Sequence, residues 1–428
     1  MAELVQRYLD QILTKHADDT GGALADYIPE LTRVDPNGFG LSLSLVDGYV
    51  YESGDTALEF TIQSVSKPFT YALALDRLGF DAVDAKIGVE PSGEAFNEIS
   101  VDESTKAPKN PMINAGAIAA VSLVPGTSAD ERFSQIREFY SACAGRDLTV
   151  DDDIYPSEKS TGSRNRAIAY MLQSFGVLDG DPDEVLDVYF RQCSIKVTTT
   201  DLAQMAATLA RGGIDPVWGR RVAAAAVVQR TLSVMVTCGM YDAAGDWVSA
   251  VGMPAKSGVG GGIAAVLPAQ LGIGVYSPLL DDKGNSVRGV KACRDLSAGL
   301  GLHFLSVTRE ARSTIRDAYD VAAGVRIYEL HGDLLFAGAE QVLRTVDEQR
   351  DGFDVAILDL SRVDDVNDAA RRMLAGMHES LTAAGKEGYV VDPDGTLAAA
   401  EAAQARVFGT LDGALRAAES FQRTRSDG

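Results

Sequence analysis

The segment QSVSKP at residues 63–68 places a serine and a lysine three positions apart, Ser64 and Lys67. It follows a predicted strand at Leu58–Ile62 and opens a predicted helix, whose first turn tolerates Pro68 because that N–H has no partner there. Residues at this spacing share a helix face. A lysine amine can take the proton of a serine hydroxyl once burial or nearby positive charge lowers its pKa well below about 10.4. The pair therefore indicates nucleophilic catalysis, although S-x-x-K also occurs by chance.

A second motif, Lys256-Ser257-Gly258, lies on a predicted strand just before three glycines at 260–262. The pattern K-[ST]-G on a strand beside S-x-x-K is typical of penicillin-recognising serine enzymes. In that arrangement a backbone N–H of the strand and the N–H of Ser64 form an oxyanion hole, which is worth roughly 10²–10³ in turnover. A glycine-rich hairpin without a chemical role is the alternative interpretation.

Residues from about 20 to 305 resemble the serine-dependent glutaminases. The matching segments, in chain order, are ADYIPEL, TIQSVSKPF, KNPMINAGAI, SEKSTGSRN, YFRQCSIKVT, CGMYDAAG and PAKSGVGGGI. The resemblance implies a β-lactamase-like fold. It also implies hydrolysis of L-glutamine by water to L-glutamate and ammonia, through an acyl-enzyme and without a metal or other cofactor. Because that family commonly forms dimers or tetramers, we expect a homo-oligomer.

The resemblance also implies catalytic roles at matching positions. Ser64 matches the nucleophile and Lys67 its base. Tyr189 matches a tyrosine that assists proton transfer, and Tyr241 matches a tyrosine beside the nucleophile. Val259 matches the residue whose backbone N–H completes the oxyanion hole with that of Ser64.

Substrate contacts are implied in the same way. Glu158 and Asn165 match residues that hold the α-amino and α-carboxylate groups, and Asn114 matches a ligand of the same end of the substrate. Gln63 matches a substrate contact, and Tyr27 a residue that lines the pocket. The full substrate-binding set that the resemblance implies is Tyr27, Gln63, Ser64, Asn114, Glu158, Asn165, Tyr189, Tyr241 and Val259. Without the resemblance, Glu158 reads as a surface acid, Asn114 as a helix cap and Tyr189 as a core residue.

Two related activities remain as alternatives. A cytoplasmic penicillin-recognising hydrolase would share both motifs, but no clear S-D-N element lies between them and the N-terminus does not read as a secretory signal. An amidase acting on asparagine would differ by one methylene of substrate, which is worth roughly 1–3 kcal/mol. We expect a preference for glutamine.

Composition limits the possible partners and compartment. The chain has 428 residues, 46% of them hydrophobic and 23% charged, with a formal net charge of −22. Such acidity disfavours binding to nucleic acid or to anionic membranes. The sequence also lacks a run of about 18 apolar residues. We therefore expect a cytoplasmic protein that binds neither.

Cysteines and histidines are few. The four cysteines are about 50 residues apart, which predicts buried reduced thiols instead of disulfides or a zinc site. They are Cys143, Cys193, Cys238 and Cys293. The four histidines, none at metal-ligand spacing, make a Ser-His-Asp triad improbable and direct attention to lysine, tyrosine and carboxylates.

The elements that must position these residues predict an α+β fold. Alternation around Asp47-Gly48 predicts a hairpin with a two-residue type I′ turn. Trp247–Lys256 and the segments GGIAAVLP and LGIGVYSP read as strands, and KACRDLSAGLGLHFLS as a closing helix. Residues 68–241 show mostly helical periodicity. This predicts an antiparallel sheet of about five strands, built from both ends of one domain (residues 1–305) around a helical insertion.

A small α/β domain is predicted at residues 324–428, after a linker at 306–323 and with a helical tail from about Thr396. It resembles a STAS domain through VRIYELHGDLLF, DVAILDLSRVDDVNDAA and YVVDPDG. The position that is phosphorylated in regulatory STAS domains matches Asp368 here, which a serine kinase cannot modify and which could cap a helix. We expect this domain to serve regulation or assembly, with a protein or ligand partner.

Overall fold

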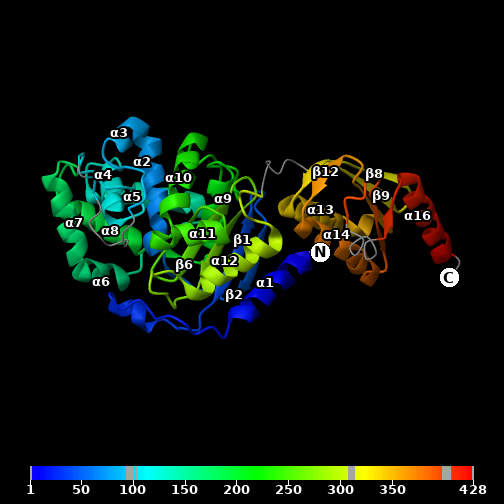
Figure 1. The fold of residues 1–428 in the computed structure, drawn as a ribbon, viewed down its shortest axis with the longest axis horizontal. Coiled ribbons are helices and arrows are strands. Elements are labelled where there is room, and N and C mark those ends of the chain that lie inside the picture. The colour runs from blue at the N-terminus through cyan, green and yellow to red at the C-terminus, as the bar shows by residue number, and fades with distance from the viewer. Residues whose placement is uncertain (1, 93–100, 103, 307–313, 398–405, 427–428) are drawn as a thin grey trace. The chain divides into compact units, whose positions relative to one another are not determined.

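The chain forms two compact units in the computed structural model, which describes residues 2–92, 101–102, 104–306, 314–397 and 406–426 (Figure 1). The larger unit is Leu9–Asp295, and the smaller unit combines Met1–Tyr8 with Leu296–Gly428. The division falls inside helices α1 (Ala2–His16) and α12 (Val287–Leu300). Across the described residues, no helix has both the length and the apolar character needed to cross a membrane.

The larger unit is built on the expected five-stranded antiparallel sheet, in the order β2-β1-β7-β6-β5. Its strands come from both ends of the unit: β1 (Gly40–Leu45), β2 (Val50–Gly54), β5 (Ala255–Ser257), β6 (Gly262–Leu267) and β7 (Leu271–Tyr276). Every residue of β1, β6 and β7 is buried, so both faces of the central sheet are covered. Helix α9 (Thr199–Ala210) makes extensive contacts with β7, β1 and β6.

The first hairpin forms in the expected place, but its turn differs from the prediction. The backbone N–H of Gly48 donates to the carbonyl of Leu45 (2.9 Å), and that of Leu45 donates to the carbonyl of Tyr49 (2.9 Å). Gly48 has a φ of 93°, whereas Asp47 is not among the residues of positive φ. A type I′ turn needs positive φ at both central residues, so the loop is instead a three-residue connection closed by a left-handed glycine.

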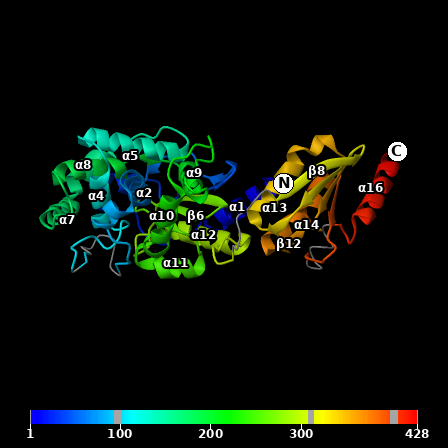
Figure 2. The same cartoon turned by 90° about the horizontal axis from the view of Figure 1, so that it is seen from above.

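The predicted helical insertion between the two groups of strands is confirmed, and most of it lies at one end of the larger unit (Figures 1 and 2). Besides α9, its helices are α2 (Lys67–Leu78), α3 (Phe80–Asp84), α4 (Asn114–Leu123), α5 (Ala129–Ala144), α6 (Ile154–Thr161), α7 (Ser163–Ser174), α8 (Pro182–Cys193) and α10 (Ala225–Cys238).

Short elements connect these helices to the sheet. Two short strands pair with each other, β3 (Phe60–Thr61) and β4 (Lys196–Val197). Three 3-10 turns are η1 (Pro29–Arg33), η2 (Gln63–Ser66) and η3 (Tyr241–Ala243).

The predicted strand at Trp247–Lys256 is mostly wrong, because α11 covers Ala244–Ala250 and β5 begins only at Ala255. Within α11 the buried residues are Ala244 and Trp247, and the Trp247 indole N–H donates to the Met253 carbonyl (2.7 Å).

The smaller unit has a second sheet, ordered β14-β13-β11-β9-β8. Its strands β9 (Val325–Leu330), β11 (Val355–Asp359), β13 (Glu387–Val391) and β14 (Val407–Phe408) are parallel to one another. Strand β8 (Ile315–Ala322) pairs antiparallel with β9, although the sequence analysis places these residues in a linker. Most of its residues are exposed, so this edge strand lacks the apolar alternation that would have revealed it.

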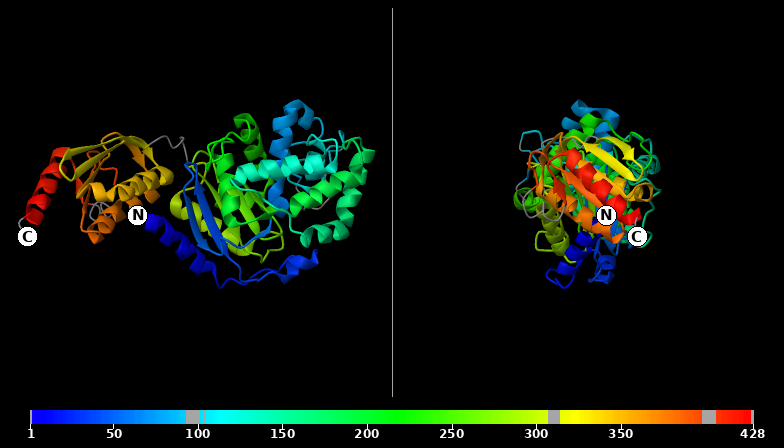
Figure 3. Two further views of the ribbon diagram at one scale, coloured as in Figure 1. Left: turned by 180° about the vertical axis from the view of Figure 1, so that it is seen from behind. Right: turned by 90° about the vertical axis from the view of Figure 1, so that its right-hand side faces the viewer.

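Helices cover both faces of that sheet (Figure 3). Helix α16 (Leu411–Ser426) packs through Ala414 and Ala418 against alternate residues of β9, β11 and β13. On the opposite face, a side chain at Gly388 would meet Leu381 of α14. The remaining elements are α13 (Phe336–Glu348), α14 (Asp368–Ala383), η4 (Arg350–Gly352) and the paired strands β10 (Gly332–Leu334) and β12 (Val363–Val366).

Asp368 is the first residue of α14 and does not cap it. The cap is Asn367, whose side-chain oxygen accepts the N–H of Ala370 (2.8 Å). Asp368 instead forms an exposed ion pair with Arg371, one turn along the helix (2.9 Å). The capping role proposed for Asp368 is therefore wrong by one residue.

Candidate active site

The turn that carries Ser64 is strained and buried. Strand β3 leads into η2, where Gln63 has a φ of 48°, a left-handed conformation that costs energy for a residue with a side chain. Ser64 is only 7% exposed. Helix α2 follows directly and begins at Lys67, so the serine and the lysine lie on consecutive turns as the sequence predicts.

Buried hydrogen bonds hold this turn from below. The Ser66 hydroxyl donates to the Gln63 carbonyl (2.6 Å) and accepts from the Gln192 side-chain amide (3.0 Å). The Tyr140 hydroxyl donates to the Ser66 carbonyl (2.8 Å), and the Thr70 hydroxyl donates to the Gln192 side-chain oxygen (2.6 Å). Several partners on α5 and α8 thus fix a backbone that would otherwise relax.

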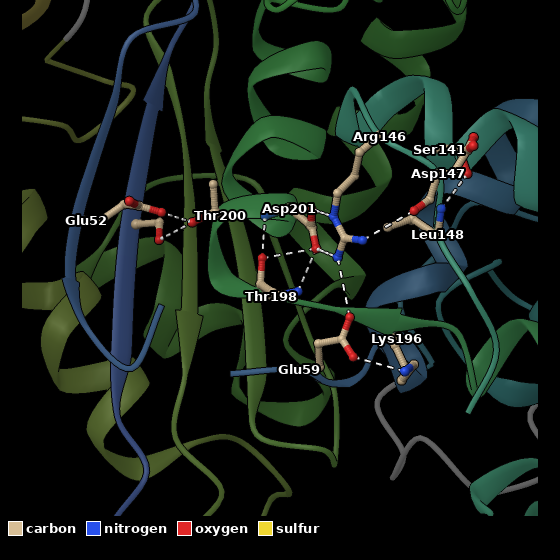
Figure 4. A network of polar contacts seen from close by, with 11 residues as sticks. Glu52, Glu59, Ser141, Arg146, Asp147, Leu148, Lys196, Thr198, Thr200 and Asp201 are labelled. Carbon is tan, nitrogen blue, oxygen red and sulfur yellow. Dashed lines mark hydrogen bonds and ion pairs between the residues drawn. The ribbon is translucent and has the colours of Figure 1, made fainter. Parts of the chain in front are cut away.

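A network of charged side chains fixes the segment that precedes this turn in the chain (Figure 4). Lys196 of β4 forms an ion pair with Glu59, the residue before β3 (2.9 Å). Arg146 binds both carboxylate oxygens of Asp201 (2.7 and 2.6 Å) and lies 3.9 Å from Glu59. The network therefore links β3, β4 and the start of α9. These elements lie next to η2, the turn that contains Ser64.

Lys67 is fully buried, without contact to a carboxylate among the described residues. Its Nζ donates to the Asn114 side-chain oxygen (2.7 Å) and to the Met112 carbonyl (3.3 Å). Burial lowers the pKa of Lys67 to about 8. An amine in this range can take up and return a proton near neutral pH.

The KSG strand lies beside the nucleophile's backbone. A Cβ added at Gly258 would lie 3.3 Å from the Ser64 backbone nitrogen and 3.1 Å from the Ile62 carbonyl oxygen, so only glycine allows this approach without displacement. Val259 follows and lines the same pocket as Ser64. The Val259 backbone N–H therefore remains a candidate second donor of the predicted oxyanion hole.

Two tyrosines flank this centre. The Tyr241 hydroxyl forms a hydrogen bond with the Ser64 side chain and donates to the Ser257 carbonyl (3.1 Å). Burial raises the pKa of Tyr241 to about 12. Tyr189 lies on α8 with its hydroxyl 3.5 Å from the Asn114 side-chain oxygen, and burial raises its pKa well above the usual value. Both phenols therefore keep their protons at neutral pH.

Glu158 is a buried acid that lacks a complete set of partners. It is 5% exposed, and its Oε1 is buried without a hydrogen-bond partner. Burial raises the pKa of Glu158 to about 7, partly offset by a hydrogen bond from Gln63. An unpartnered buried carboxylate oxygen is costly, and a cationic group of a ligand would satisfy it.

One pocket of about 250 Å³ collects most of the predicted residues. Its predicted lining residues are Tyr27, Gln63, Ser64, Asn114, Glu158, Asn165, Tyr189 and Val259. The sequence reasoning missed four others: Thr161, Gly162, Arg164 and Cys193. Arg164 precedes Asn165, and Cys193 lies one helical turn after Tyr189. Their closeness to predicted site residues on the same helices could have indicated that they line the pocket. Lys67 and Tyr241 are not among the lining residues and reach the pocket through Asn114 and Ser64.

Asn114 joins the base to the rest of the pocket. Its side-chain nitrogen donates to the Asn165 side-chain oxygen (3.0 Å), while its oxygen accepts from Lys67 (2.7 Å). It is the first residue of α4, whose N-cap is Ile113. The capping interpretation of Asn114 is therefore wrong, since its side chain is directed at the lysine.

Comparisons with known proteins identify the family of the chain. The glutaminase family model matches residues 22–305. The chain is 45% identical to a protein named glutaminase from Corynebacterium glutamicum, across 92% of this chain and 95% of that one. The chain belongs to the glutaminase family. A crystal structure named Mglu shares 44% identity with a TM-score of 0.71, covering 92% of this chain and 99% of that one. The glutaminase domain thus contains every residue of the pocket.

The second family model, that of the STAS domain, matches residues 318–411 and so confirms the other resemblance. Glutaminase 1 of Bradyrhizobium diazoefficiens is 48% identical across 88% of this chain, and the chain spans 64% of that protein's length. The glutaminase of Microcystis aeruginosa is 51% identical over 72% of this chain and 91% of its own. The shared region of that relative is about as long as the glutaminase domain together with α1.

Proposed function

We propose that the protein is a glutaminase that hydrolyses L-glutamine to L-glutamate and ammonia. The observation that carries the proposal is one pocket lined by a nucleophilic hydroxyl on Ser64, an unpartnered buried oxygen on Glu158 and the amides of Asn114 and Asn165. Free glutamine presents an amide, an ammonium and a carboxylate, which these groups complement. The related proteins are named glutaminases, which supports the same substrate.

Substrate binding follows from the charges of the pocket. Glu158 neutralises the α-ammonium, whose charge in turn lowers the pKa of the acid and keeps it ionised. Asn114 and Asn165 donate N–H groups to the α-carboxylate without burying another full charge. Tyr27 and Gln63, whose side chains lie 3.4 Å apart between hydroxyl and amide oxygen, complete the wall.

Acylation starts at Lys67. With a pKa of about 8, roughly a tenth of the amines are neutral at pH 7, and the neutral amine accepts the Ser64 proton. The serine oxygen then attacks the side-chain carbonyl carbon of glutamine, and the backbone N–H groups of Ser64 and Val259 stabilise the oxyanion. As the C–N bond breaks, the leaving nitrogen takes a proton from Lys67, relayed through Tyr189 or Tyr241, and departs as ammonia.

Deacylation reverses these roles with water as the nucleophile. Lys67 takes a proton from the water, whose oxygen attacks the ester carbonyl, and the proton returns to Ser64 as glutamate leaves. Tyr241 stays protonated throughout because its pKa is about 12, so it acts as a hydrogen-bond donor and proton relay and not as a base.

The test is ammonia release from glutamine by wild type, Ser64→Ala and Ser233→Ala, an exposed control on α10. We expect turnover by wild type and by the control, and a loss of about 10⁴-fold or more in Ser64→Ala. Intact-mass analysis with glutamine should show a glutamyl adduct in wild type alone. Unchanged activity in Ser64→Ala would contradict the mechanism. An equal kcat/KM for asparagine would contradict the preference for glutamine.

Compartment, assembly and the role of the STAS domain complete the proposal. We propose a cytoplasmic homo-oligomer, either dimer or tetramer, whose STAS domain serves regulation or assembly. The four cysteines are all buried free thiols, which supports a reducing compartment. Light scattering of the full chain, with and without residues 315–428, measures the mass of the assembly and the contribution of the STAS domain to it.

A further inference from the structure

A second lysine, Lys256 of β5, is fully buried beside the site and has no part in the proton transfers described above. Its Nζ donates to the Ser257 carbonyl (2.7 Å) and lies 3.8 Å from the centroid of the Tyr241 ring. No carboxylate of the described residues forms an ion pair with it. Burying an amine without an oppositely charged partner costs free energy. The burial of Lys256 therefore needs a functional or structural explanation.

The Tyr241 backbone needs outside support. Its φ of 56° is left-handed, which for a bulky residue persists only when the surroundings hold it. Its hydroxyl shares the Ser257 carbonyl with Lys256 and meets the Ser64 side chain. Lys256 therefore contacts the face of the Tyr241 ring, and it also binds the Ser257 carbonyl that accepts the Tyr241 hydroxyl.

Lys256 does not line the substrate pocket, whose walls are formed by other residues. A direct contact with glutamine therefore does not account for its burial. We propose, on the basis of the glutaminase function proposed above, that Lys256 is a positioning residue that holds the Tyr241 phenol against the Ser64 hydroxyl. It acts through the ring and the Ser257 carbonyl, and not on the substrate.

The charge state of Lys256 is compatible with this role. Burial, together with the neighbouring Lys67, lowers the pKa of Lys256 well below its usual value. The titratable groups that face it are Lys67, Cys238 and Tyr241. The amine has N–H groups to direct at a carbonyl and at a ring face in either charge state.

A double-mutant cycle tests the proposal. Lys256→Met keeps an unbranched side chain but removes the N–H donors, and Tyr241→Phe keeps the ring but removes the hydroxyl. We expect Lys256→Met to lower kcat for glutamine about 10²-fold while KM changes less than about threefold. In the Tyr241→Phe background, the same change should lower kcat less than about threefold further, because the hydroxyl it positions is already absent.

Controls separate this result from misfolding and from failure of the proposed function. Lys86→Met, on a lysine that contacts Gly176 and Asp179 away from the pocket, should keep wild-type kcat. If Lys256→Met does not fold, as judged by thermal unfolding, the cycle is run with Lys256→Leu, which also removes the N–H donors. Equal losses in both backgrounds, or a rise in KM at constant kcat, would overturn the positioning role. Absence of ammonia release by wild type would contradict the glutaminase function instead.

Discussion

Some buried charges of the larger unit lack a partner of opposite charge, although others, such as Asp201 with Arg146 (2.6 Å), are paired. In the larger unit, Lys67 and Lys256 are fully buried and Glu158 nearly so, without an oppositely charged partner among the described residues. In the smaller unit, the buried acid Glu340 forms an ion pair with Arg344 on the same helix (3.0 Å). Since an uncompensated buried charge destabilises a fold, such groups persist where a ligand or a reaction uses them.

A second buried acid of the smaller unit, Asp392, also has its hydrogen-bond partners within that unit. Asp392 accepts backbone N–H groups of Thr396 and Leu397 (2.9 Å each), so its charge serves the local loop. The larger unit leaves the pairing of Glu158 to a substrate, whereas the smaller unit satisfies these acids internally. This contrast supports chemistry in the first and binding or assembly in the second.

The largest effect that would sharpen this contrast is expected from substitution of the buried Lys67. Lys67→Met should lower kcat about 10³-fold or more, since it removes the base. Lys386→Met in the smaller unit, where the amine contacts the Phe353 carbonyl and ring, should change kcat less than twofold. Steady-state ammonia release measures both, and comparable losses would contradict the division of roles.

The wild-type pH profile tests the same base. Burial lowers the pKa of Lys67 to about 8, and the neutral amine is the active form in the mechanism proposed above. We therefore expect kcat/KM to fall as the pH drops below about 8, by up to tenfold per pH unit. The pKa of Glu158 in the free protein is about 7, so protonation of this acid weakens binding further below neutrality. A profile flat from pH 6 to 9 would exclude Lys67 as the base.

An intermediate effect is expected from removing one charge in each unit. Glu158→Gln should raise KM about 10²-fold by losing the partner of the α-ammonium. It should leave the melting temperature equal or higher, since a buried unpaired carboxylate disappears. Glu340→Gln should leave KM unchanged and lower the free energy of unfolding by about 2 kcal/mol, because the ion pair with Arg344 is lost. Kinetics with thermal denaturation distinguish the two, and destabilisation by Glu158→Gln would break the comparison.

The smallest effect is expected from deleting residues 315–428, a cut placed before β8 because that strand belongs to the second sheet. If the smaller unit serves regulation or assembly alone, kcat should change less than twofold in the folded truncate. The high coverage of the Microcystis relative by part of this chain supports an autonomous glutaminase domain. A folded truncate with lost kcat would assign the smaller unit a direct part in turnover.

Much of the fold was predictable from local patterns. Alternation of apolar and polar residues located β1, β2, β6 and β7, and helical periodicity located the insertion. In both cases the burial of one face produces a regular spacing of apolar residues along the sequence. The prediction was wrong at Trp247–Lys256, where an apolar run fits a helix or a strand, and it missed β8 because an exposed edge strand needs little apolar surface.

The sequence by itself determined the candidate nucleophile, its base and the family, because S-x-x-K, KSG and the matching segments are local. Only the tertiary structure decided that Lys67 is desolvated, that one oxygen of Glu158 lacks a partner and that Lys256 lies against the Tyr241 ring. The physical reason is that desolvation and hydrogen-bond completion depend on side chains contributed by distant segments. Residue spacing does not report which of those segments excludes water.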